Sequence, residues 1–216
     1  MNKINKRYHH ETLARGADAM RTLADAKITI CGAGALGANL AWTLARTGCQ
    51  RLTLIDMDRV EEHNLSTQPW ARGDIGQLKA KLLAVQLYRA LGVEAPAHAV
   101  QLTADNAARL LDGAQVVIDV FDNSPSRATV QTTCAALGIP CLHAGMADGY
   151  AEVIWDPGYR VPSAAHDDVC DYPLARNLIT LTVSVTAEAL IRHLTTDARR
   201  AYTITLDDLS IQALDL

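Results

Sequence analysis

A glycine-rich turn constrains the fold of this chain more than any other segment. Residues 27–31 (KITIC) form a short run of mostly β-branched and apolar side chains. Gly32, Gly34 and Gly37 follow it directly in a G-x-G-x-x-G pattern. Such glycines permit a tight turn and a close approach of the backbone to phosphate, while the first N–H groups of the next helix attract an anion. Asp56 ends the next predicted strand, where a carboxylate would bind ribose hydroxyls. The pattern predicts a nucleotide-binding strand–turn–helix–strand unit.

This unit alone fits more than one ligand. An NAD-dependent oxidoreductase and an ATP-binding protein both use a glycine turn followed by an acidic residue about 20 positions later. A purely structural turn in an α/β fold is a third interpretation. The segments that follow Asp56 are therefore needed to separate these possibilities.

Strand and helix patterns alternate along most of the chain. Helices are predicted at 11–25, from the glycine loop 32–37 to 47, and at 78–91, 106–111, 126–137 and 174–194. Strands are predicted at 27–31, 51–56, around Val100, and at 115–120, 140–144, 150–155 and 202–206. Residues 156–173 are rich in Pro, Gly and Asp and form a predicted long crossover loop. The alternation predicts one Rossmann-like α/β domain over 1–216, doubly wound, with a mostly parallel sheet, helices on both faces and a C-terminal antiparallel extension.

Composition excludes several classes of protein. With 216 residues, 49% of them apolar and 20% charged, the chain is long enough and apolar enough for a globular core. The net charge of −4 argues against nucleic acid as the main partner. We expect no membrane association, because no apolar run approaches the roughly 20 residues of a membrane span. The basic N-terminus lacks the apolar segment of a secretory signal. The cysteines are odd in number and never spaced C-x-x-C, which favours free thiols in the cytoplasm.

Four further segments share their order and spacing with one known family. Residues 54–68 (LIDMDRVEEHNLSTQ) resemble the motif D-x-D-x-V-x-x-x-N-L-x-R-Q, and 76–80 (GQLKA) resemble G-x-x-K-A. Residues 119–123 (DVFDN), followed by Arg127, resemble D-x-x-D-N-x-x-x-R, and the fourth segment is the pair 7–8 (RY) before the first helix. The matching region runs from residue 7 to 195. On these motifs the chain resembles the ThiF/MoeB/HesA-type adenylyltransferases, bacterial relatives of ubiquitin-activating enzymes.

The resemblance implies an enzyme that adenylates a carboxylate with ATP and releases pyrophosphate. Its substrate would be the C-terminal glycine of a small ubiquitin-like or sulfur-carrier protein, and the enzyme would be a homodimer. In such a reaction the protein mainly positions charges. Lys79 would neutralise phosphate charge, and Asp122 would hold Mg²⁺, which prefers one or two carboxylates together with phosphate oxygens. Arg127 would contact the phosphates or the incoming carrier tail.

The nucleotide is expected to lie against the glycine loop and the segments that follow the neighbouring strands. The residues that would contact it are Gly32, Gly34, Ala35, Leu36, Gly37, Asp56, Asp58, Asn64, Gln68, Lys79 and Asn123. Several of them also have a plain structural interpretation. The alternative for Lys79 is an ordinary solvated lysine on a helix, and the alternative for Asp122 with Asn123 is a helix N-cap. An N-cap role and a ligand role are compatible with each other.

Cysteine chemistry gives one expected site and excludes another. Cys170 lies near the end of the predicted loop, where relatives often have a cysteine that in some of them forms a thioester or persulfide with the carrier. An exposed loop cysteine suits a thiolate nucleophile, and a cysteine without a catalytic role is the alternative. Many relatives hold a structural zinc ion with two C-x-x-C pairs. Neither pair is present here, so no structural zinc is expected.

Two arginines of the family pattern are missing. His10 stands where the resemblance places an arginine that crosses a dimer interface to the phosphates, and Thr67 stands in place of the other. Histidine is mostly neutral at cytoplasmic pH and threonine carries no charge, so phosphate stabilisation is expected to be weaker. The sequence offers Arg7, Arg15 and Arg72 as replacements.

Three other functions stay open at this stage. The chain could adenylate a peptide or a tRNA-linked carboxylate, because residues 45–58 are also similar to tRNA threonylcarbamoyladenosine dehydratases. It could be a nucleotide-binding pseudoenzyme that acts as a partner, since two family arginines are absent. An NAD-dependent oxidoreductase would leave Asn64, Lys79 and Asp122 without a role.

Overall fold

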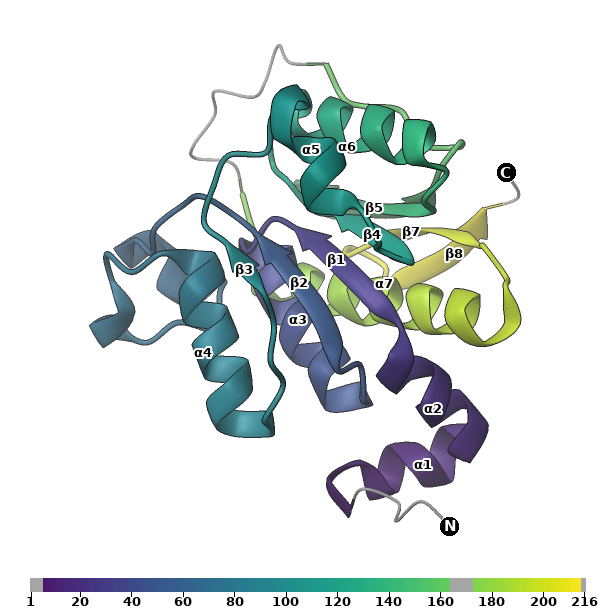
Figure 1. The fold of residues 1–216 in the computed structure, drawn as a ribbon. Helices are drawn as coiled ribbons and strands as arrows, with labels where there is room; N and C mark the ends of the chain where they lie inside the picture. The colour runs from purple at the N-terminus through teal and green to yellow at the C-terminus, as the bar shows by residue number, and fades with distance from the viewer. Residues whose placement is uncertain (1–5, 164–172, 215–216) are drawn as a thin grey trace.

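An eight-stranded sheet lies at the centre of the computed structural model, which describes residues 6–163 and 173–214 (Figure 1). The strand order is β3-β2-β1-β4-β5-β6-β7-β8. The strands are β1 (Lys27–Cys31), β2 (Arg51–Ile55), β3 (Ala97–His98), β4 (Val116–Asp119), β5 (Cys141–Ala147), β6 (Tyr150–Trp155), β7 (Ala201–Thr205) and β8 (Ser210–Leu214). The strands β1 to β5 pair in parallel, and β5 to β8 pair antiparallel. This arrangement confirms the predicted fold class.

Helices cover both faces of the sheet. They are α1 (His9–Arg15), α2 (Ala17–Asp25), α3 (Ala35–Thr47), α4 (Lys79–Leu91), α5 (Ala104–Leu111), α6 (Ser124–Leu137) and α7 (Arg176–Thr196), with short 3₁₀ helices at Lys6–Tyr8, Glu62–Ser66 and Arg72–Asp74. One apolar core joins α3, α4 and α7 to one face of the sheet, and a smaller one joins α5 and α6 to the other. Alternate residues of β4 enter the two cores, Ile118 the larger and Val117 the smaller. Such strands are apolar throughout because both of their faces are buried.

Three predicted elements were wrong in detail. The helix predicted at 11–25 is two helices, because Gly16 has φ +86° between them, a conformation that breaks a right-handed helix. Val100 lies outside any strand and is exposed, and β3 ends two residues before it. The strand predicted at 202–206 is β7, but it is followed by β8, which was missed. Only pairing with β7 holds β8 in the sheet, and none of its five residues is buried.

The crossover loop is described only in part. Residues 156–163 contain no helix or strand, and Tyr159 is buried there, with 4% of its surface exposed. Cys170 lies outside the described residues, so the prediction of a nucleophile at this position stays a prediction. Among the described helices, none is both long enough and apolar enough to cross a membrane.

The N-terminal helices are held by one buried leucine. Leu23 of α2 is fully buried in the larger core, where α2 packs against α7. We predict that Leu23→Ala lowers the free energy of unfolding by about 2–5 kcal/mol, because it removes buried methyl groups and leaves a cavity. Leu13 of α1 is 71% exposed. Leu13→Ala should stay within about 0.5 kcal/mol of the parent. Urea denaturation measures both, and equal losses would show that α2 is not anchored through Leu23.

Candidate nucleotide-binding site

The glycine loop between β1 and α3 is shaped by two close backbone contacts. Gly32 has φ +106°, and a Cβ atom there would lie 2.9 Å from the carbonyl oxygen of Val120. A Cβ atom on Gly37 would lie 1.9 Å from the carbonyl oxygen of Gly32. A Cβ atom on Gly34, in contrast, would have no atom within 4 Å. The outer glycines are therefore needed to fold the loop, and Gly34 borders open space in front of the start of α3.

The start of α3 is suited to bind an anion. The helix begins at Ala35, after Gly34 as its N-cap, and no acidic side chain lies in its first turn. The first N–H groups of a helix have no partner within the helix and carry a partial positive charge. The backbone at Ala35, Leu36 and Gly37 thus has the properties expected of a phosphate-binding turn.

Asp56 holds the glycine loop in place. It follows β2, only 6% of its surface is exposed, and its Oδ2 accepts a hydrogen bond from the Ala33 N–H at 2.6 Å. Its Oδ1 accepts the N–H of Asp58 at 2.7 Å. Burial raises the pKa of the Asp56 carboxyl, and the hydrogen bond from Ala33 acts against this shift. The structure thus shows Asp56 positioning two loops, while its contact with ribose stays a prediction.

Two of the sequence motifs meet in an ion pair. Lys79 is the first residue of α4 and is 7% exposed. Its Nζ lies 3.2 Å from Oδ2 of Asp58, and its backbone N–H donates to the Asp58 carbonyl at 2.8 Å. The side chain of Asp58 is half exposed. Lys79 is therefore not a solvated surface lysine, because its ammonium group is held beside the loop that follows β2.

Asn64 and Gln68 stabilise the segment between β2 and α4. Asn64 is buried, and its Oδ1 accepts the Glu61 N–H at 3.0 Å. Gln68 accepts the indole N–H of Trp70 at 2.7 Å. These contacts give both residues a structural role, and the predicted contacts with nucleotide stay predictions.

A guanidinium group that the sequence analysis missed lies beside Thr67. Arg176, at the start of α7, donates to the Thr67 carbonyl at 2.9 Å and to Oδ1 of Asn39 in α3 at 3.2 Å. Of the candidates named from sequence, Arg15 pairs with Glu11 and Glu188, and Arg7 donates to the Leu91 carbonyl. Arg72 is exposed in the short helix Arg72–Asp74. No sequence spacing links 176 with 67, because only the packing of α7 against α3 brings them together.

The end of β4 carries the third motif. Asp122 is exposed, and Asn123 is the N-cap of α6, with Oδ1 accepting the Ser126 N–H at 3.0 Å. Arg127 is buried and donates to the Tyr159 hydroxyl at 3.0 Å and to the Ala144 carbonyl at 2.9 Å. The N-cap interpretation of Asn123 is confirmed, whereas the predicted roles of Asp122 and Arg127 toward magnesium, phosphate and the carrier stay predictions.

A buried histidine, His143, contacts Asp119, the first residue of this motif. Nδ1 of His143 is 2.8 Å from Oδ2 of Asp119, and Nε2 is 3.1 Å from Oδ2 of Asp156. Tyr159 stacks on the imidazole with 3.8 Å between ring centroids, and Arg127 lies 3.5 Å from the Asp119 carboxylate. Burial lowers the pKa of His143, but its hydrogen bonds to the two aspartates outweigh this effect and raise it. The structure thus shows a buried imidazole in which each ring nitrogen has a carboxylate partner.

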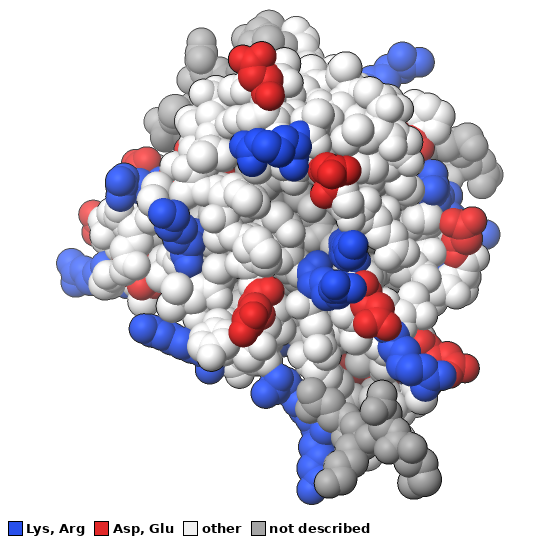
Figure 2. All heavy atoms as spheres, in the orientation of Figure 1, with Lys and Arg blue, Asp and Glu red and all other residues white. Residues whose placement is uncertain are grey.

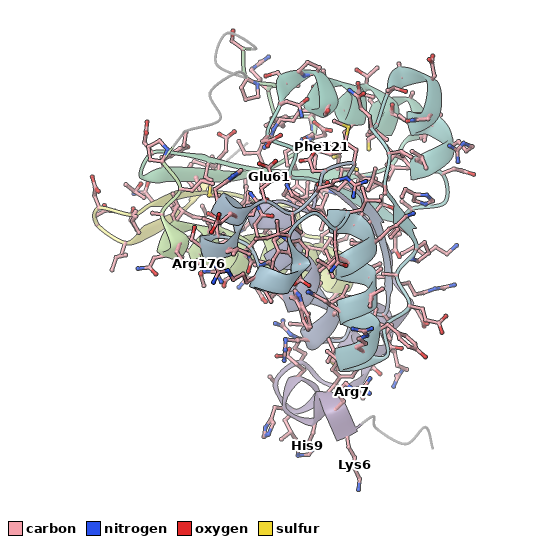
Figure 3. All side chains as sticks on the ribbon, turned by 90° about the vertical axis from the view of Figure 1, so that its left-hand side faces the viewer. Lys6, Arg7, His9, Glu61, Phe121 and Arg176 are labelled. Carbon is pink, nitrogen blue, oxygen red and sulfur yellow. The ribbon has the colours of Figure 1, made fainter. Side chains whose placement is uncertain are left out.

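The motifs converge on one edge of the sheet. The glycine loop, Asp56 and Asp122 follow the carboxyl ends of β1, β2 and β4, which are neighbours in the sheet. Chain order reverses between β1 and β4, the position at which open α/β sheets bind ligands. Figure 3 shows Glu61 and Phe121 at this end of the molecule and His9 at the opposite end. His10, the next residue of α1, is thus remote from the site within the same chain.

Comparison with known proteins agrees with this geometry. The sequence profile of the ThiF family matches residues 8–198. The chain belongs to this family. A sulfur carrier protein adenylyltransferase from Thermus thermophilus is 33% identical over 158 residues, which cover 70% of this chain and 58% of that protein. The tRNA threonylcarbamoyladenosine dehydratase of Escherichia coli is 36% identical over 138 residues, which cover 62% of this chain and 51% of that enzyme.

Solved structures show the same fold. This ThiF-family chain resembles the crystal structure of E. coli MccB with ATP at a TM-score of 0.80 and 19% identity, covering 99% of this chain and 72% of that one. At this identity the likeness concerns the fold alone. The chain spans just over half the length of the two curated relatives described above.

The glycine loop makes a paired prediction. Gly37→Ala should destabilise the fold by about 1–3 kcal/mol, because its methyl group collides with the Gly32 carbonyl. Gly34→Ala should change the stability by less than about 0.5 kcal/mol, because its methyl group meets open space. The same methyl group should weaken nucleotide binding by about tenfold or more, since backbone must approach phosphate closely there. Urea denaturation and calorimetric titration with Mg-ATP measure the two effects. Undiminished binding by Gly34→Ala would place the nucleotide elsewhere.

Proposed function

We propose that this ThiF-family chain is an adenylyltransferase that activates a carboxylate with ATP, and that its substrate is the C-terminal glycine of a small ubiquitin-like or sulfur-carrier protein. The observation that carries the proposal is the meeting of the glycine loop, the Lys79–Asp58 pair and the exposed Asp122 at the switch point of the sheet. The resemblance to the T. thermophilus sulfur carrier protein adenylyltransferase supports the substrate class.

The reaction requires one bond to form and one to break at the α-phosphate. A carboxylate oxygen attacks that phosphorus, the bond to the bridging oxygen of the β-phosphate breaks, and pyrophosphate leaves with the electron pair. The backbone at the start of α3 would hold phosphate oxygens in a fixed position, without reorganisation during the reaction. Lys79 is buried, so its ammonium charge is screened less by water and acts more strongly on a nearby phosphate.

Magnesium fits the residues at the end of β4. Asp122 is exposed at this edge, and its nearest described side-chain contact is Nδ2 of Asn123, 3.3 Å from Oδ1. Mg²⁺ keeps several waters and takes one or two carboxylates plus phosphate oxygens, so a single exposed aspartate is a suitable donor. When bound, the ion would neutralise charge on the leaving pyrophosphate. Asp122 would hold it.

We propose a homodimer because of the position of His10. The residue is exposed on α1, and its neighbour His9 lies far from Glu61 and Phe121 in Figure 3. Within one chain it is too remote to act on a phosphate. We propose that α1 instead approaches the site of a second copy, as the family pattern implies for an arginine at this position. Its imidazole would then offer a ring N–H as a hydrogen-bond donor to the phosphates.

A tRNA-linked carboxylate is the second candidate substrate. It is favoured by the 36% identity to the E. coli tRNA threonylcarbamoyladenosine dehydratase. The net charge of −4 weighs against it, and Figure 2 shows lysine and arginine interspersed with aspartate and glutamate on the face in view. Proteins that bind nucleic acid usually gather basic side chains in a patch or stripe. A protein carboxylate therefore suits this surface better.

Pyrophosphate exchange tests the proposal. In the presence of a sulfur-carrier protein ending in Gly-Gly, the chain should exchange labelled pyrophosphate into ATP. Lys79→Ala should reduce the exchange rate by about 100-fold or more, because a preorganised charge at the phosphates is lost. Lys81→Ala is the matched control: Lys81 lies on the same helix but is exposed, and its loss should leave the rate unchanged.

The outcomes separate the candidates. Exchange that depends on tRNA rather than on the carrier protein would favour the tRNA-linked substrate. Nucleotide binding without exchange for any acceptor would indicate a pseudoenzyme. An exchange rate that Lys79→Ala leaves intact would contradict the proposed site, even if the chain proved to be an adenylyltransferase.

A further inference from the structure

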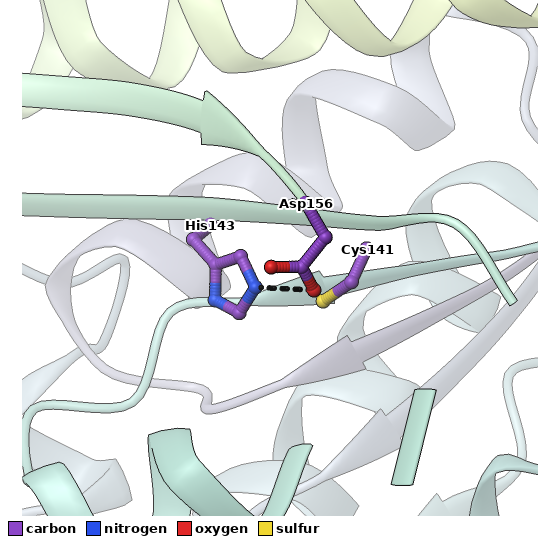
Figure 4. Close-up of side chains that lie close together, drawn as sticks. All are labelled: Cys141, His143 and Asp156. Carbon is purple, nitrogen blue, oxygen red and sulfur yellow. Dashed lines mark hydrogen bonds and ion pairs between the residues drawn. The ribbon is translucent and has the colours of Figure 1, made fainter. Parts of the chain in front are cut away.

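Three metal-binding side chains lie together on the face of the sheet covered by α6, away from the glycine loop. Cys141 and His143 are two residues apart on β5, so their side chains point to the same face. Asp156 directly follows β6, and its N–H donates to the Cys141 carbonyl at 3.1 Å, which places it opposite Cys141. Figure 4 shows the three side chains pointing toward one another.

Their donor atoms are close enough to share one ion. The sulfur of Cys141, a ring nitrogen of His143 and a carboxylate oxygen of Asp156 all lie within 4.8 Å of one another. Zinc binds sulfur at about 2.3 Å and nitrogen or oxygen at about 2.0–2.2 Å, so its tetrahedral ligands lie roughly 3.5 Å apart. The three atoms would therefore have to approach one another by about 1.3 Å at most to reach that spacing.

We propose that Cys141, His143 and Asp156 bind a zinc ion. Thiolate, imidazole and carboxylate together are a set that zinc accepts, whereas magnesium and calcium select oxygen ligands. Three protein ligands leave a fourth position for water. The Asp156 side chain is 22% exposed, which gives that position a route to solvent, while the side chain of His143 is fully buried. The site is separate from the tetrathiolate zinc site that the sequence lacks.

Groups around the three ligands already orient them. Asp119 is hydrogen-bonded to Nδ1 of His143. This contact fixes the orientation of the imidazole ring and leaves Nε2 to face Asp156. Gln131 donates to the second oxygen of Asp156, Oδ1, at 2.8 Å. Metal-binding histidines usually donate their other ring N–H to a carboxylate, and such partners contribute about 10–100-fold to metal affinity. The contacts of His143 and Asp156 therefore match those of a preorganised metal site.

Such an ion would stiffen the support of the candidate nucleotide site. It would join β5 to the end of β6, and through His143 it would fix Asp119 at the end of β4. Asp119 in turn accepts the Phe121 N–H at 3.2 Å, directly before Asp122. The ion would thus stabilise this edge of the sheet, and its binding does not depend on adenylation.

Cobalt substitution tests the site without any measurement of activity. The purified chain, stripped with a chelator and dialysed with Co²⁺ alone, should bind one equivalent and show a sulfur-to-cobalt charge-transfer band in the near ultraviolet. Zn²⁺ added afterwards should abolish the band. Cys141→Ser should lose it, whereas Cys49→Ser should keep it. Cys49 is the matched control, since it is a fully buried cysteine in the larger core and is not one of the three ligands.

A second variant protects the test against misfolding. Asp156 is partly exposed, so Asp156→Asn should fold, as checked by circular dichroism, and should weaken metal binding by about tenfold or more. A folded parent chain that shows no charge-transfer band and retains no zinc after dialysis would overturn the proposal. It would also be overturned by a band that persists in Cys141→Ser.

Discussion

The hydrogen bond between the Asp56 carboxylate and the Ala33 N–H is the contact on which the candidate site depends. It ties the end of β2 to the glycine loop at 2.6 Å, while the other oxygen of the same carboxylate holds the N–H of Asp58. Asp58 in turn forms an ion pair with Lys79 at the start of α4. One buried side chain thus sets the position of the anion-binding turn relative to the buried lysine, although each comes from a different part of the sequence.

The sequence predicted this part of the structure well because its signals are local. Glycine at 32 and 37 is dictated by backbone contacts, the strands show continuous apolar runs, and the acid follows the next strand. The same local logic predicted the N-cap at Asn123 and the parallel sheet with an antiparallel extension. These features follow from steric rules and hydrophobic patterning, which operate over a few residues at a time.

Features that depend on distant contacts were missed. Gly16 gives a break that helical periodicity does not reveal, and β8 is held only by pairing with its neighbour. Arg176 reaches Thr67 because α7 crosses α3, and Asp119 meets His143 because β4 pairs with β5 in register. Neither pair has a spacing that a motif could encode. The buried network around His143 was therefore accessible only from the structure, although every residue in it is visible in the sequence.

Thermal denaturation with different nucleotides tests the central claim most directly. A ligand that binds only the folded chain, present at about 100 times its dissociation constant, adds about 2.7 kcal/mol of stability. For a chain of 216 residues this should raise Tm by roughly 5–10 °C. We predict this increase in Tm with Mg-ATP and none with NAD. If NAD alone raised Tm, or if neither nucleotide raised it, the assignment of this sheet edge as an ATP site would be contradicted.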